Sequence, residues 1–269
     1  MSDIKSSISQ VIEEQNIPIE WSQIIFEELE NIDLKFSDSR VDLSKKPFVT
    51  IDGKDANDFD DAVLCEKNFE GFNLWVAIAD VAEVVNKNSE IDKEAYKRGT
   101  SIYFPNTVVP MLPEKISNNI CSLIPNEKRN VLVCEINFNA DAEIKSYDFF
   151  EAIICSAHRF TYSEVLEYRK GNSEIVNSLE SLKILTNKLL KNRQKRSALE
   201  IESQDPSLII GDDGSLEKIN LPKRLFSHQM IEESMIAANI CSAKFIKKNI
   251  GFGIYRVHEE PDFIKVDNL

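Results

Sequence analysis

The sequence predicts an α+β fold in which a mixed or antiparallel β-sheet is flanked by helices. Segments rich in β-branched and aromatic residues occupy residues 48–79 and 131–155, and segments with helical spacing follow them. The chain has 269 residues, of which 42% are hydrophobic, so it can bury a sizeable core. It contains only 8 Gly and 9 Pro, which excludes the disordered and fibrous classes.

Five strands are expected in this sheet. Three of them cover residues 48–51, 62–65 and 72–79, and the last of these is apolar enough to be buried. The other two cover residues 131–138 and 147–155, and we expect them to pair across a turn at residues 139–141. Strands in this order, with helices after them, predict the α+β class with a mixed or antiparallel sheet.

Helices are predicted on both sides of the strands. Residues 1–46 form a helical connector in which Ile8, Val11 and Ile12 have helical spacing. A second domain covers residues 47–269, and its helices are expected at residues 163–169, 173–196 and 228–248. The long middle helix carries an apolar face that consists of Leu179, Leu182, Leu185 and Leu189.

Targeting and cysteine signals point to a cytoplasmic protein without a membrane anchor. No apolar run approaches the roughly 20 residues that a membrane span needs. The amino terminus lacks the basic start and apolar stretch of a secretory signal. The five cysteines are scattered and never form a Cys-x-x-Cys pair, so neither a zinc site nor a disulfide framework is expected.

The main chemical signal is a cluster of five aspartates, Asp52, Asp55, Asp58, Asp60 and Asp61, between two predicted strands. Like charges at such close spacing raise one another's pKa and oppose folding unless a cation compensates them. Carboxylate oxygens are hard ligands that suit Mg²⁺, with Mn²⁺ as a possible substitute. The cluster therefore predicts a divalent metal site.

The aspartate cluster has two other interpretations, a solvated acidic turn and a calcium-binding loop. A solvated acidic turn is plausible because Asp-Gly, here Asp52-Gly53, is a strong hairpin signal. The apolar flanks and Phe59 argue against it, because they anchor the segment in a core. A calcium-binding EF-hand loop that begins at Asp55 would place Phe59 and Asp60 where an oxygen ligand and Gly are needed, so it is excluded.

The spacing of Asp52, Asp58, Asp60 and Asp61 resembles the aspartate signature of the ribonuclease II/ribonuclease R (RNB) family. Further segments resemble that family in the same order along residues 41–260, with the ribonuclease R type favoured. They are residues 74–80 (LWVAIAD), 98–105 (RGTSIYFP), 109–113 (VPMLP), 116–118 (ISN), 121–123 (CSL) and 231–239 (IEESMIAAN). Residues 251–255 (GFGIY) are closer to the ribonuclease II type.

The resemblance implies roles for individual residues. Asp52, Asp58, Asp60 and Asp61 would form the catalytic metal site. Tyr103 would stack on the terminal base, although it could instead be an ordinary core aromatic. Glu232 would lie near the ribose, although it could be a plain acid on a helix surface. Ile201 stands where the family often has a second stacking phenylalanine, which puts one side of a base clamp in doubt.

The implied activity is metal-dependent hydrolytic 3′→5′ exoribonuclease action that releases nucleoside 5′-monophosphates from single-stranded RNA, with Mg²⁺ as cofactor and Mn²⁺ possible. Residues 47–269 would be the RNB catalytic domain truncated at its C-terminal side, because the family's downstream Ser-Pro-Ile-Arg segment is not reached. We expect the fragment alone to be inactive, DNA not to be a natural substrate and the protein to be a monomer.

Charge and basic residues bear on this interpretation. The net charge of −13 is unusual for an RNA enzyme, unless cations at the aspartates and a local basic face meet the phosphates. The candidate basic residues are Lys183, Lys188, Lys191, Arg193, Lys195, Arg196, Lys244, Lys247 and Lys248, which could equally be solvated helix faces. The alternatives are a catalytically silent RNB-like RNA-binding protein and an ion-binding regulatory module that does not bind RNA.

Overall fold

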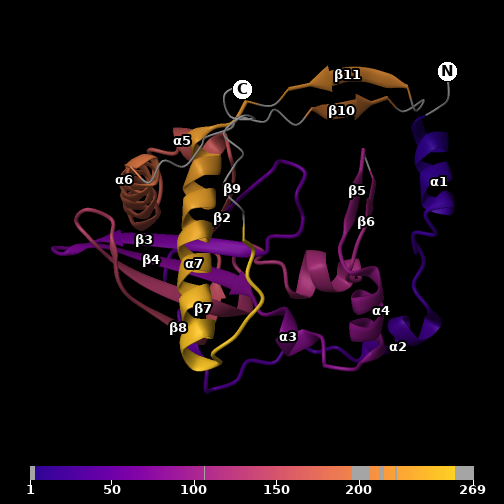
Figure 1. Cartoon of the computed structure of the whole chain (residues 1–269), viewed down its shortest axis with the longest axis horizontal. Helices are drawn as coiled ribbons and strands as arrows, with labels where there is room; N and C mark the ends of the chain where they lie inside the picture. The colour runs from indigo at the N-terminus through magenta and orange to yellow at the C-terminus, as the bar shows by residue number, and fades with distance from the viewer. Residues whose placement is uncertain (1–3, 106, 196–205, 212–214, 222, 258–269) are drawn as a thin grey trace.

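A seven-stranded mixed sheet forms the centre of the described part of the chain (Figure 1). The structure, a computed structural model, describes residues 4–105, 107–195, 206–211, 215–221 and 223–257. The strand order is β1-β8-β7-β4-β3-β2-β9. The strands are β1 (Val41–Asp42), β2 (Val49–Asp52), β3 (Asp61–Lys67), β4 (Gly71–Ala79), β7 (Lys128–Asn139), β8 (Ile144–Cys155) and β9 (His158–Thr161).

The pairing pattern confirms the predicted α+β class and mixed sheet. Strands β2, β3, β4, β7 and β8 pair antiparallel in succession. At the two edges, β9 pairs parallel with β2 and β1 pairs parallel with β8. All five predicted strands are present at the centre, whereas the two parallel edge strands were not predicted.

Alternate residues of the central strands serve two separate cores, one on each face of the sheet. Val63 and Val76 belong to a core under α6 (Ser173–Lys195) and α7 (Phe226–Asn249). Leu64 and Trp75 belong to a second core, which also contains Ile25 from the amino-terminal helices. Figure 1 shows α6 and α7 on one side of the sheet, away from α2, α3 and α4. The period of two residues along β3 and β4 therefore accounts for both layers.

The remaining elements are short. The helices are α1 (Ile4–Glu14), α2 (Gln23–Glu30), α3 (Val81–Val84), α4 (Glu90–Arg98), the π-helix η1 (Ile116–Ile120) and α5 (Glu164–Glu167). Two hairpins lie outside the main sheet and consist of β5 (Ile102–Phe104) with β6 (Thr107–Val109), and β10 (Ser207–Ile210) with β11 (Leu216–Asn220). The helix predicted at residues 163–169 is shorter than expected, because it ends at Glu167.

The predicted connector, residues 1–46, contributes to the sheet at its end. It contains helices α1 and α2 as expected, but it also contains β1. The Arg40 guanidinium is buried and lies 2.6 Å from the Asp80 carboxylate at the end of β4. The last residues of the connector are therefore packed with the sheet, and the domain boundary at residue 46 stays a prediction.

Other sequence predictions have mixed outcomes. Cys65, Cys121, Cys134 and Cys241 are buried free thiols, and Cys155 is a partly buried free thiol. No helix among the described residues is long and apolar enough to cross a membrane. Ile201 and Arg196 lie outside the residues that the structure describes.

Candidate active site

The four predicted aspartates gather at one end of the sheet. Asp52 is the last residue of β2 and Asp61 is the first residue of β3. These strands pair antiparallel, with Val49 opposite Val63, so the two carboxylates come from the same end of adjacent strands. Residues 53–60, which we call the aspartate loop, connect the strands and carry Asp58 and Asp60.

Burial and mutual repulsion destabilise the charged forms of these carboxylates. Burial and, to a smaller extent, the charges of Asp52 and Asp60 together raise the pKa of Asp61 to about 7. The pKa of Asp52 is raised to about 6, mainly by burial and also by the charges of Asp58 and Asp60, whereas the charge of Arg159 opposes the rise. Burial and the charge of Asp58 also raise the pKa of Asp60. A bound cation would relieve each of these effects.

The four aspartates have the chemistry that a hard divalent cation requires, because their carboxylate oxygens are hard ligands. The Oδ2 atom of Asp52 is buried and has no hydrogen-bond partner, as expected for a ligand atom without its ion. Among the described residues, however, no group of three or more Asp, Glu, His or Cys side chains is placed to hold a metal ion.

Tyr103 and two of the four predicted metal ligands, Asp58 and Asp60, line the same open cavity, which has a volume of about 800 Å³. Asp58 and Asp60 enter it from the aspartate loop. Tyr103 enters it from β5, where it pairs with Val108 of β6, and its residue is 70% exposed. This exposure excludes the interpretation of Tyr103 as a core aromatic. An aromatic ring that lines a cavity with carboxylates can stack on a base while the phosphate lies near the acids.

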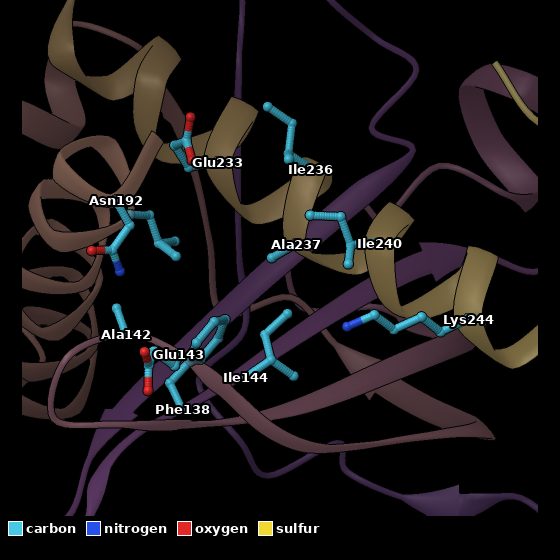
Figure 2. A pocket seen from close by; sticks show the side chains of 11 residues that line it. Phe138, Ala142, Glu143, Ile144, Asn192, Glu233, Ile236, Ala237, Ile240 and Lys244 are labelled. Atoms are coloured by element: carbon cyan, nitrogen blue, oxygen red, sulfur yellow. The ribbon is translucent and has the colours of Figure 1, made fainter. Parts of the chain in front are cut away.

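Glu232 is placed differently. It lies on α7, where its carboxylate is 2.8 Å from Arg193 and also pairs with Arg224. Its neighbour Glu233 is 3% exposed and pairs with Arg193 at 2.9 Å. Glu233 lines a second cavity of about 410 Å³, which lies between α6, α7 and the turn that joins β7 to β8. Figure 2 shows Glu233 at this cavity. Glu232 does not line the cavity that contains Tyr103 and the aspartates.

The ion pairs of Glu232 also affect the expected basic face on α6. Arg193 is committed to two carboxylates on α7. Lys183 is mostly buried and lies 3.1 Å from Glu180 on its own helix. These two cations are engaged in ion pairs within the fold, so the free basic face on α6 is smaller than the sequence indicated.

Arg159 is a member of the site that the sequence did not reveal. It lies on β9, and its Nη2 atom donates hydrogen bonds to the backbone carbonyls of Gly53 and Lys54, the latter at 2.9 Å. Its guanidinium also lies 5.4 Å from the centre of the Phe59 ring. Arg159 therefore fixes the start of the aspartate loop and contributes positive charge beside Asp52. Residues 158–161 gave no strand signal, because Phe160 is their only large apolar residue.

Tyr162 and His228 form a second unpredicted feature. Their rings stack with centroids 3.8 Å apart and an interplanar angle of 15°. Burial raises the pKa of Tyr162, and the charges of Asp52 and Asp61 raise it further, so this ring lies near the carboxylates. The Ser227 hydroxyl donates to the Tyr162 carbonyl. The start of α7 is thereby attached to the end of the sheet that carries the aspartates.

The sequence of this chain is similar to that of a known domain family. The family described as RNB domain matches residues 40–269. Ribonuclease R of Vibrio parahaemolyticus is 40% identical over 270 residues, which is 96% of this chain and 32% of that protein. Ribonuclease R of Escherichia coli is 40% identical over 257 residues, which is 91% of this chain and 32% of that protein.

A solved structure agrees with these sequence matches. The structure of Mycoplasma genitalium RNase R in complex with ribose methylated single-stranded RNA has a TM-score of 0.91 to this chain at 33% identity. The match covers 99% of this chain and 43% of that one. The chain thus spans about a third of the length of the curated relatives that it matches.

Proposed function

Because this chain belongs to the RNB domain family, we propose that it forms part of the catalytic domain of an exoribonuclease that degrades RNA from the 3′ end. The observation that carries the proposal is the single cavity lined by Asp58, Asp60 and Tyr103. It offers acidic groups for a cation and an exposed aromatic ring for a base. The names of the relatives support the same activity, although the chain spans only part of their length.

The metal dependence rests on the carboxylates. Asp52, Asp58, Asp60 and Asp61 would hold the cation, for which Mg²⁺ is expected and Mn²⁺ is possible. A divalent ion at this place would supply Lewis acidity, which lowers the pKa of an attacking water and offsets charge on the phosphate. The raised pKa values of Asp52 and Asp61 and the unpartnered Oδ2 of Asp52 support this assignment.

The substrate is proposed to be single-stranded RNA, and the products nucleoside 5′-monophosphates. Tyr103 would stack on the base next to the scissile bond, because stacking tolerates any base. Arg159 holds the aspartate loop from one side and keeps positive charge beside Asp52. The role of Glu232 near the ribose stays a prediction from the resemblance. A monomeric state, exclusion of DNA and a cytoplasmic location also stay predictions.

The experiment uses the full-length gene product and a 5′-labelled RNA. One sample has a free 3′ hydroxyl and another has a blocked 3′ end. With Mg²⁺ we expect stepwise shortening from the free 3′ end and release of nucleoside 5′-monophosphates, identified by chromatography. A chelator should stop the reaction. Internal fragments from the blocked RNA, or full activity in the chelator, would contradict the proposal.

A further inference from the structure

The hydroxyl of Ser122 connects the two residues that flank Asp58. Ser122 follows η1 and its residue is 0% exposed. Its Oγ atom donates a hydrogen bond to the carbonyl of Asn57 at 2.8 Å and accepts one from the N–H of Phe59 at 3.0 Å. Both the donor and the acceptor capacity of one hydroxyl are thus used on the backbone on either side of Asp58.

The next residue strengthens the same contact. The N–H of Leu123 donates to the carbonyl of Phe59 at 2.8 Å, so residues 122 and 123 run along the end of the aspartate loop. Inside the loop, the backbone hydrogen bond from Ala56 to Gly53 is longer, at 3.3 Å. The position of Asp58 is therefore determined more by Ser122 and Leu123 than by the loop's own turn.

Ser122 is itself fixed to the sheet by Arg129, a buried residue near the start of β7. The Nε atom of Arg129 donates to the Ser122 carbonyl at 2.9 Å, and its Nη2 atom donates to the Asn119 carbonyl at 3.1 Å. The Nη2 atom also lies 2.6 Å from the carboxylate of Glu127. A continuous set of hydrogen bonds thus leads from the central sheet through Ser122 to the backbone of Asn57 and Phe59, on either side of Asp58.

We propose that Ser122 is a positioning residue: by fixing the backbone on either side of Asp58, it keeps the Asp58 carboxylate near Asp52 and Asp60, which with it are proposed ligands of a divalent cation. The inference rests on the proposed metal site. Without the hydroxyl, the Asn57 carbonyl and the Phe59 N–H lose their partner, and this end of the loop loses its attachment. Metal ligands need correct orientation, and loss of a group that orients them commonly weakens metal affinity by about 10–100-fold.

The test compares Ser122→Ala with a matched control in the full-length gene product. Ser178→Ala is the control, because Ser178 is 5% exposed and its hydroxyl accepts the N–H of Cys65 on β3 at 3.0 Å. It lies on α6, among residues that line a different cavity from the aspartates. Mn²⁺ binding to the metal-free proteins is measured by electron paramagnetic resonance, and thermal unfolding is measured in parallel.

We expect Ser122→Ala to weaken Mn²⁺ binding by about 10-fold or more, and Ser178→Ala to change it by less than about 2-fold. RNA cleavage by Ser122→Ala should recover in part when Mg²⁺ is raised, at a temperature at which the parallel unfolding measurement shows the variant to be folded. If Ser122→Ala does not fold, Ser122→Cys replaces it, because a thiol fills the space but is a weak hydrogen-bond donor and acceptor.

The outcomes separate this inference from the proposed function. Wild-type protein that binds no Mn²⁺ would overturn both. Tight binding by wild type together with equal binding by the Ser122 variant would overturn the positioning role and leave the proposed metal site standing. Equal weakening by the Ser122 and Ser178 variants would also overturn it, because the effect would then follow from general destabilisation.

Discussion

Asp61 at the start of β3 lies beside Asp52 at the end of β2, and the charge of Asp52 adds to the burial that raises the pKa of Asp61 to about 7. In water, an aspartate has a pKa near 3.9. The folded protein therefore binds a proton at Asp61 over a pH range in which the unfolded chain has released it. Without a cation, this pair of carboxylates opposes folding at neutral and alkaline pH.

The first prediction concerns Asp61→Asn in a chelator. A raised folded-state pKa contributes stability at low pH, and this contribution is lost as pH rises from about 4 to about 7. At pH 8, neutral asparagine should therefore make the metal-free protein more stable than wild type, by about 2–4 kcal/mol. The difference should close towards pH 4. Denaturant unfolding at both pH values measures it, and an unchanged difference would contradict the raised pKa.

The second prediction concerns Asp60→Asn in the full-length gene product. Asparagine keeps the shape but loses charge that the cation needs, so cleavage should fall by about 10²–10³ or more while RNA binding stays nearly intact. Asp55→Asn is the control, because Asp55 lies in the same loop and lines the same cavity but is not a proposed ligand. Single-turnover cleavage rates of both variants are measured at saturating Mg²⁺. A wild-type rate for Asp60→Asn would show that Asp60 is not a ligand of the catalytic cation.

The central sheet was predictable from sequence because its strands are runs rich in apolar, β-branched and aromatic residues. In β4 and β7 alternate residues pack into the two cores, so both faces of these strands carry apolar side chains. The edge strands β1 and β9 contain two and four residues, so they give no such pattern. Their parallel pairing joins segments far apart in sequence, such as Val49 with His158, and local patterns do not report it.

The residues of the candidate site also divide into those that the sequence predicted and those that it did not. The aspartates were found because five carboxylates in one short segment are costly without a function, and the family predicted from the ordered motifs is confirmed by the match to residues 40–269. Arg159 was missed, and Ser122 was included only as part of the segment 121–123 without a role, since each acts on the aspartate loop through backbone carbonyls or amides. Such contacts depend on tertiary packing, so the residue types alone do not reveal them.

The third prediction tests Tyr103 as a stacking residue. Stacking on a base is worth about 1–3 kcal/mol, so Tyr103→Ala should lengthen the final RNA product while the first cleavages are less affected. Tyr103→Phe should keep the wild-type end product, because the ring remains. Tyr96→Ala serves as control, since Tyr96 on α4 is 91% exposed and does not line the cavity. Product lengths are measured on a denaturing gel, and an end product unchanged by Tyr103→Ala would exclude a stacking role.

The last prediction concerns Glu232, which joins α7 to Arg193 on α6 and to Arg224. Burial favours its neutral form, but the hydrogen bonds and charges of the two arginines together lower its pKa below the ordinary value. A lowered pKa contributes stability that is present above the unfolded-state pKa and is lost as pH falls through the folded-state value. The stabilisation should therefore be complete at pH 7 and should decline as pH falls below the unfolded-state value of about 4.3.

Glu232→Gln should accordingly lower the free energy of unfolding at pH 7 by about 0.5–1.5 kcal/mol, a modest effect because the pair is partly screened by solvent. The difference from wild type should shrink in acid. Glu180→Gln is the control, since its pairs with Arg169 and Lys183 include an exposed arginine and should contribute less. Denaturant unfolding at pH 7 and near pH 3.5 gives these values. Stability equal to wild type at pH 7, with a raised KM for RNA, would instead indicate that Glu232 contacts the ribose and not mainly the arginines.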